Sequence, residues 1–234
     1  MKNSMKYFWL MLLLLLPAVG QCIDFPTIKT NAKNIKEFVP KNWRVMETAW
    51  GDLNHDNRKD IVMVLQCTDP ENKMMAEDSS RVDANPRILM IAFKDSAANV
   101  YNLVLQSNTF ILTHDQPAAD EPFQGMRISN DMVQFNFHVW AKDSARTCNC
   151  SYKFRYQNAR FELIGYDAVD MKQVSGEMEK VSINFATKKM SVQKVNIDEK
   201  VKPEAEVRSF DCPALKDLRT FIRPFTWTFE GQVL

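Results

Sequence analysis

Four polar side chains with the chemistry of calcium ligands lie within nine residues, at positions 52 to 60. Counted from the first of them, they fall at positions 1, 3, 5 and 9 of a short segment: Asp52, Asn54, Asp56 and Asp60. Calcium takes about six to eight oxygen ligands, and a tight loop directs alternate side chains toward one centre. The spacing therefore predicts a calcium-binding loop.

The backbone of this segment is expected to supply the turn and one more ligand. Arg58, at position 7, is the expected carbonyl ligand. Position 6 of such a loop needs a sharp turn, often at positive φ, and Asn57 is the best substitute for the usual glycine. The segment is not an EF-hand, because Met63 stands where that motif has a bidentate glutamate.

The stretch GDLNHDNRKDIVMV resembles the calcium loop of the integrin-type FG-GAP repeat, D-x-[DN]-x-D-G-x-x-D before an apolar strand. The resemblance implies side-chain ligation by the four polar residues above, carbonyl ligation by Arg58, and a structural Ca²⁺ on a β-hairpin. The chain has one copy, whereas a propeller needs several blades. The wider motif order is similar to uncharacterised secreted bacterial proteins with one such loop per domain, which implies export and a β-rich fold. The alternative is a polar hairpin turn that binds no metal.

The histidines offer no catalytic set. His55 lies in the calcium loop and is expected to face solvent, His114 begins a polar loop, and His138 alternates with aromatic residues on a strand. No pair has metal-ligand spacing, and no Gly-x-Ser-x-Gly elbow occurs. The enzymatic alternative is a hydrolase with paired carboxylates, for which the candidates are Asp120, Glu121 and Glu162.

The chain has five cysteines, which are Cys22, Cys67, Cys148, Cys150 and Cys212. In an oxidising compartment, four of them are expected to form two disulfides, in a pairing that the sequence does not fix. Cys148 and Cys150 are two residues apart, so both point to one face of a strand.

The first twenty residues have the order of a secretory signal peptide. Two lysines precede an apolar run that ends at Leu16, and Pro17 and small residues follow up to Gly20. Residues 1–20 are therefore predicted to be cleaved, which leaves a single periplasmic or extracellular domain over 21–234. No second apolar stretch has the length of a membrane span. An alternative is an outer-membrane lipoprotein anchored through a lipid on Cys22.

Composition is that of an ordinary globular domain. The chain has 45% apolar and 11% aromatic residues, enough to bury a core. Its formal net charge of +1 gives no electrostatic reason to expect nucleic acid as a partner.

Short runs rich in β-branched and aromatic residues predict a mainly β fold. Most are separated by two to five turn-forming residues, which favours an antiparallel meander or sandwich-like sheet. The predicted strands are 43–50, 60–67, 87–93, 100–106, 131–140, 152–157, 160–167, 181–187 and 225–230. One short helix is expected over 31–39, which Pro40 ends, and a second over 212–222.

Two connections are long enough to carry function. They run from Thr68 to Pro86 and from Thr113 to Gly125, and both are polar. The sequence thus predicts an exported, calcium-stabilised β module of the bacterial envelope that binds a protein or a glycan through these loops. The competing hypotheses are the hydrolase and the structural lipoprotein.

Overall fold

The computed structural model describes residues 25–234 except 76–78, 80, 117–118, 142–144, 199–202 and 213. The predicted signal peptide and Cys22 lie outside these residues. Strands make up 55% of the structure and helical turns 5%, which confirms the mainly β, antiparallel prediction. Within the described ranges, no helix is long and apolar enough to cross a membrane.

The first sheet has five strands in the order β1-β7-β6-β3-β2. All neighbours in it are antiparallel. Its strands are β1 (Asn31–Ala32), β2 (Trp43–Gly51), β3 (Asp60–Cys67), β6 (Arg87–Asp95) and β7 (Val100–Ser107). The connection between β3 and β6 holds a 3-10 turn and a small hairpin, η2 (Pro70–Asn72), β4 (Lys73–Met75) and β5 (Arg81–Asp83).

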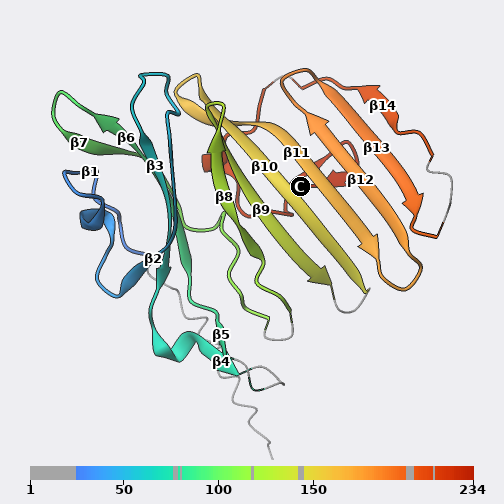
Figure 1. Ribbon diagram of the computed structural model, residues 1–234, viewed down its shortest axis with the longest axis horizontal. Helices are drawn as coiled ribbons and strands as arrows, with labels where there is room; N and C mark the ends of the chain where they lie inside the picture. Colours follow the sequence, from blue (N-terminus) through green and yellow to red (C-terminus); the bar gives the residue numbers. More distant parts are fainter. Residues whose placement is uncertain are drawn as a thin grey trace, which may run out of the picture.

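The second sheet is a seven-stranded meander in which every strand pairs with its neighbours in the sequence. Figure 1 shows the two sheets side by side, and β2 contacts β8 where they meet. The strands are β8 (Phe123–Ser129), β9 (Met132–Ala141), β10 (Arg146–Gln157), β11 (Arg160–Lys172), β12 (Glu177–Asn184), β13 (Lys189–Asn196) and β14 (Glu206–Ser209). A last hairpin closes the chain, β15 (Thr228–Phe229) and β16 (Gln232–Val233).

The central strands of the first sheet, β3 and β6, are buried on both faces, which explains their unbroken apolar runs. On β3, Ile61, Met63 and Leu65 pack under the N-terminal segment. Val62 and Val64 alternate with them and pack into the larger core shared with the second sheet. Because side chains alternate along a strand, one run of apolar residues serves two separate cores.

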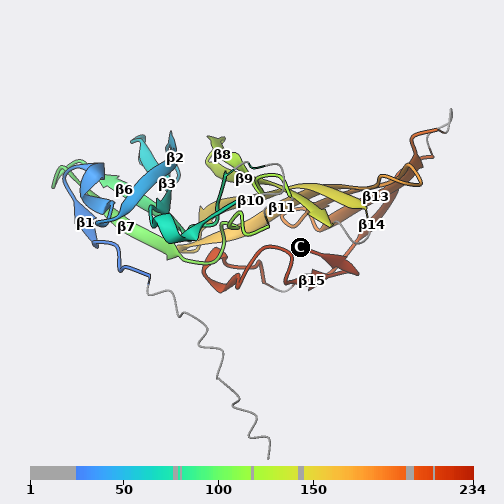
Figure 2. The ribbon, with the colours of Figure 1, turned by 90° about the horizontal axis from the view of Figure 1, so that it is seen from below.

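One face of the second sheet is lined by aromatic rings. Figure 2 shows the C-terminal segment lying over this face. At its centre, the buried Phe110 meets five rings edge to face: Phe135, Phe137, Tyr152, Phe154 and Phe221. This face is called the inner face below. The opposite, outer face is polar, which matches an antiparallel sheet with one solvated side.

The short helix predicted over 31–39 is not formed. Asn31–Ala32 pairs with β7 instead, and only a four-residue 3-10 turn follows, η1 (Ile35–Phe38). Its N-cap is Asn34, which forms a capping box with Glu37. Val39 is already extended, as a residue before proline must be, so the segment has room for a single turn.

The second predicted helix, over 212–222, is also reduced to one 3-10 turn among the described residues, η4 (Leu218–Thr220). Asp217 caps this turn by accepting a hydrogen bond from the backbone of Arg219 at 3.0 Å.

Candidate functional site

The predicted calcium loop connects β2 to β3 and is held by its own side chains. Asp52 accepts hydrogen bonds from the backbone N–H groups of Asp56 at 3.2 Å and Asn57 at 2.8 Å. Asn54 also accepts from the Asp56 N–H at 3.1 Å, and Asp56 accepts from the Arg58 N–H at 2.9 Å. Asn57 has φ of 61°, the left-handed conformation that the sixth position was predicted to need.

Asp60 joins the loop to the neighbouring strand of the sheet. Its carboxylate is fully buried and accepts from the backbone N–H of Leu53 at 2.8 Å and of Lys94, on β6, at 3.0 Å. Burial raises the pKa of Asp60, and the negative charges of Asp56 and Asp52 raise it further. Asp56 and Asp52 therefore lie close enough to Asp60 for their charges to repel its carboxylate.

This mutual repulsion is the feature that fits a divalent cation. A cation among the three carboxylates would offset both their repulsion and the burial of Asp60. Among the described residues, no three or more His, Cys, Asp and Glu side chains are arranged so that they could hold a metal ion. The expected set also includes the amide oxygen of Asn54 and the carbonyl of Arg58. All three of its carboxylates accept hydrogen bonds from backbone N–H groups in this conformation.

His55 links the loop to the second sheet. Its side chain is 66% exposed, in line with the expected solvent position, and its Nε2 lies 3.0 Å from Asp131 in the β8–β9 turn. Asp131 also faces Arg155 of β10 at 3.4 Å. The loop is thus tied to both sheets.

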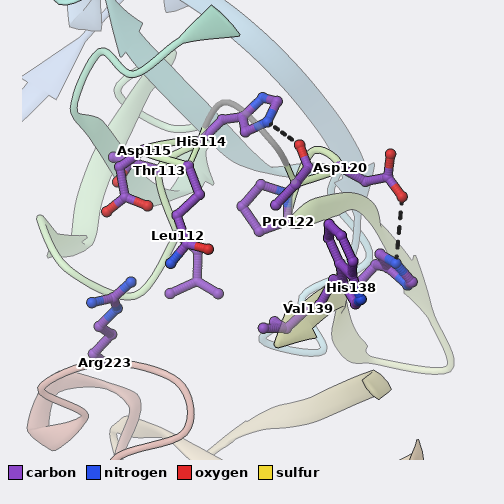
Figure 3. Close-up of a pocket in the computed structure, with 12 residues that line it drawn as sticks. Leu112, Thr113, His114, Asp115, Asp120, Pro122, His138, Val139 and Arg223 are labelled. Atoms are coloured by element: carbon purple, nitrogen blue, oxygen red, sulfur yellow. Dashed lines mark hydrogen bonds and ion pairs between the residues drawn. The ribbon is translucent and has the colours of Figure 1, made fainter. Parts of the chain in front are cut away.

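A pocket opens at the other end of β9, where the second long connection of the sequence lies. Its walls are the described parts of 112–122, the end of β9 and one residue of the C-terminal segment, Arg223. Figure 3 shows His114 and His138 on two sides of this pocket, with Asp120 between them. His114 contacts the carbonyl of Ala119 at 2.7 Å, and His138 lies 3.7 Å from Asp120.

A buried ion pair holds the wall of the pocket. The Arg87 side chain is only 1% exposed and binds Glu121 through two hydrogen bonds, of 2.6 and 2.8 Å. Arg87 also donates to the carbonyl of Leu112 at 2.6 Å, and Glu121 accepts from the Phe123 N–H at 2.9 Å. Both ends of the connection are thereby fixed to β6.

The pocket continues onto the polar outer face of the second sheet. A second hollow shares Asp120, His138 and Trp140 with it and reaches Asn149 of β10. His138 is held in place there by a 2.8 Å hydrogen bond between its Nδ1 and the Asn149 side chain. A third hollow meets the second at Asn149. The pocket and these two hollows are called the groove below, and the third hollow adds Gln124, Gln134, Asn136, Ser151 and Asp167 to its lining.

The carboxylates proposed for a hydrolase belong to different networks. Glu121 is bound to Arg87, whereas Glu162 is 2% exposed and is held by Gln157 and Arg160 at the β10–β11 turn. Asp120 stands at the rim of the pocket with 84% of its side chain exposed.

The described cysteines carry free thiols, so the predicted disulfides are not formed among Cys67, Cys148, Cys150 and Cys212. Cys148 and Cys150 do point to one face of β10, as their spacing predicts, and both contribute to the core.

The sequence-based prediction did not identify two residues that shape the groove. They are Arg87, which anchors its wall, and Asn149, which binds His138. A signal existed for Arg87, since a charged residue opens the apolar run RILMIAF and a buried charge needs a partner. Nothing in the sequence pairs Asn149 with His138 before the register of β9 and β10 is known.

No family model, no curated protein and no solved structure matches this chain. The FG-GAP-like loop therefore remains a prediction from local sequence.

Proposed function

We propose that this chain is an exported, noncatalytic β module that binds a glycan in the groove over β9 and β10. A structural Ca²⁺ in loop 52–60 stabilises it. The observation that carries the proposal is the groove itself, an open channel lined by hydrogen-bonding side chains that are already held in position.

The chemistry of the lining favours a sugar. The second hollow is formed by Asp120, His138, Trp140, Thr147, Asn149, Met171 and Gln173. These supply carboxylate, imidazole, amide and hydroxyl groups that can pair with sugar hydroxyls, next to an indole ring on which a sugar ring can pack. The Nε1 of Trp140 is buried and has no hydrogen-bond partner among the described residues, so the contact that Trp140 offers a sugar is its ring and not its N–H group.

The charge of the groove narrows the class of glycan. The described lining of the second hollow has one carboxylate and no lysine or arginine. In this hollow an anionic polysaccharide would meet Asp120 without a lysine or arginine beside it, since the arginine of the groove, Arg223, lines the neighbouring pocket. A neutral or amino sugar therefore fits the second hollow better. A protein partner is less favoured, because the core of a protein interface is depleted in charged groups and enriched in aromatic anchors, whereas this lining is mainly polar.

The test is binding of the full chain to an array of neutral, amino and anionic oligosaccharides, followed by calorimetry on the best ligand. Trp140→Ala and Asn149→Ala are expected to weaken binding by about tenfold each, the loss of one aromatic contact or one hydrogen bond. Gln193→Ala is the matched control, because this amide lies on β13 and donates to Pro203. Absence of binding to any glycan, or equal losses in the control, would contradict the proposal.

A further inference from the structure

The two histidines of the groove are each held in one tautomer. His138 Nδ1 lies 2.8 Å from Oδ1 of Asn149, and His114 Nε2 lies 2.7 Å from the carbonyl oxygen of Ala119. Both oxygens can only accept a hydrogen bond, so these two ring nitrogens carry the protons. In the neutral rings, the other nitrogens, His138 Nε2 and His114 Nδ1, are therefore hydrogen-bond acceptors.

Each of these acceptors faces a carboxylate oxygen, which is a second acceptor. His138 Nε2 lies 3.7 Å from Oδ2 of Asp120, and His114 Nδ1 lies 3.7 Å from Oε2 of Glu121. Both distances exceed that of a direct hydrogen bond. The two carboxylates differ, because Glu121 binds Arg87, whereas Asp120 has 84% of its side chain exposed and shares the second hollow with no lysine or arginine of the described lining. His138 Nε2 and Asp120 are called the acceptor pair below.

A free amino group is the sugar substituent that satisfies the acceptor pair. One atom placed beside both acceptors must donate two hydrogen bonds to satisfy them. A hydroxyl group and an amide N–H each have one proton to donate, whereas an ammonium group has three. The ammonium group also carries the charge opposite to that of Asp120, which strengthens the hydrogen bond to the carboxylate. A hydroxyl or N-acetyl group therefore satisfies one acceptor of the pair, and an amino group satisfies both.

The indole ring of Trp140 favours the same substituent. Trp140 and His138 are two residues apart on β9, so their side chains lie on the same face of the sheet. Trp140 lines both the pocket and the second hollow, together with Asp120. The face of an indole attracts a cation as well as a sugar ring. Figure 3 shows Arg223, the arginine of the pocket, apart from the acceptor pair.

We propose that the groove is specific for glycans that carry a free amino group, and that the acceptor pair binds this group. The inference rests on the proposed glycan site and narrows its ligand to amino sugars that are not acetylated. A metal ion at the acceptor pair is disfavoured, because in the described part of the chain no three His, Cys, Asp and Glu side chains are arranged to hold one.

Binding through a neutral imidazole depends on pH. When the ring of His138 takes up a proton, Nε2 becomes a donor and can bind Asp120 directly. The other charged side chains that line the pocket are Asp115 and Arg223. The neighbouring strands face the ring with side chains that do not titrate, which are Thr147, Asn149 and Met171. An amine gains charge as pH falls, so attraction to Asp120 alone predicts stronger binding at acid pH, whereas the acceptor pair predicts weaker binding.

The test uses the full chain and sets of oligosaccharides that share a backbone and linkage and differ in one substituent. Within each set the same carbon carries an amino group, an N-acetyl group or a hydroxyl group, and calorimetry measures the affinities near neutral pH. We expect the amino member to bind at least about tenfold more tightly than the other two, the difference of one charge-assisted hydrogen bond. Equal or tighter binding of another member would overturn this inference and leave the glycan site standing. Absence of binding by every member of every set would remove the glycan site and this inference with it.

Two variants separate the acceptor pair from the overall charge of the protein. Asp120→Asn is expected to reduce the preference for the amino member by about tenfold, because the amide keeps an acceptor but has no charge. Glu206→Gln is the matched control, since it removes the same charge from an exposed position on β14, at the edge of the sheet opposite β8. This control should keep the preference. Equal losses in the two variants would assign the preference to net charge and overturn the proposal.

The pH dependence tests the role of the imidazole. Between about pH 7.5 and about pH 5, the range in which histidine side chains take up a proton, the affinity of the wild type for the amino member is expected to fall by about tenfold. His138→Gln should not show this fall, because its amide keeps an acceptor oxygen and does not titrate. A wild-type affinity that rises toward pH 5, or an equal fall in His138→Gln, would overturn the proposal.

Discussion

Glu47 of β2 accepts a hydrogen bond from the backbone N–H of Met126 on β8, at 2.9 Å. This side chain reaches across the junction between the two sheets, where β2 and β8 contact each other but share no backbone ladder. Gly125 makes the approach feasible, because it has φ of 99° and a Cβ there would lie 3.3 Å from the Glu47 carboxylate. The irregular start of β8 thus exposes an N–H group that a side chain, and not a strand, satisfies.

Removal of this acceptor is expected to destabilise the fold. Glu47→Ala leaves the Met126 N–H without its partner in a partly buried junction, at a cost of roughly 1–3 kcal/mol. For a chain of this size, that corresponds to a decrease in melting temperature of about 2–12 °C. Glu47→Gln keeps an acceptor oxygen and should lose much less. Equal melting temperatures for the alanine variant and the wild type would show that the junction does not depend on this bond.

The Arg87–Glu121 pair gives a second prediction, on the wall of the glycan groove. Arg87→Met should lower the unfolding free energy by about 3 kcal/mol, the lower end for a broken buried pair, because Glu121 is partly exposed. The double variant Arg87→Met with Glu121→Gln should recover part of that loss, since no uncompensated carboxylate remains. Chemical denaturation measures both. If the double variant is as unstable as the single one, the loss of unfolding free energy comes from packing and not from an uncompensated charge.

The fold was largely predictable where β-branched and other apolar residues form a continuous run. The runs over 60–67, 87–93 and 160–167 were predicted as strands and are strands, because their apolar residues pack on one or both faces. No strand was predicted over β8, and the predicted loop up to Gly125 runs past its start at Phe123, since FQGMRIS contains a glycine and polar residues that match no strand pattern. β13 was missed because its buried Met190 and Val195 lie among lysines and polar residues.

The two candidate sites also differ in how well the sequence predicts them. Loop 52–60 is local, so its spacing was readable from nine residues, down to the positive φ of Asn57. The groove brings together Asp120, His138 and Asn149, which come from a long connection and two strands. Their meeting depends on strand register and on the pairing of Arg87 with Glu121, 34 residues away. Neither is encoded in a local pattern.

Asp60 is expected to titrate above its ordinary pKa of 3.8 when calcium is absent, because it is buried and faces Asp56 and Asp52. With a raised pKa, the folded state binds the proton more tightly than the unfolded state does. Protonation of Asp60 therefore stabilises the folded state increasingly as pH falls through the raised pKa toward 3.8. This contribution to stability is absent at higher pH. Carboxyl NMR of Asp60 in EDTA and in calcium measures the effect. Bound calcium should shift the titration to lower pH, and identical curves would argue against a metal among these carboxylates.

The melting temperature in EDTA and in about 10 mM calcium tests the loop as a structural metal site. Extracellular calcium sites bind at about 10⁻⁴ M at their tighter end. A 100-fold excess over that value stabilises the folded state by about 2.7 kcal/mol, or about 5–10 °C for a domain of this size. Asp56→Ala should abolish the shift, because it removes a central ligand of the predicted set.

The matched control for that measurement is Asp95→Ala. Asp95 caps the β6–β7 turn by accepting from the N–H groups of Ala97 and Ala98, so its loss affects a polar turn outside the loop. This variant should melt lower than the wild type in EDTA and still gain the full calcium shift. If the wild type gains nothing from calcium, the side chains of loop 52–60 act only as acceptors for its own backbone. Asp60 would then persist as the buried link between the loop and Lys94.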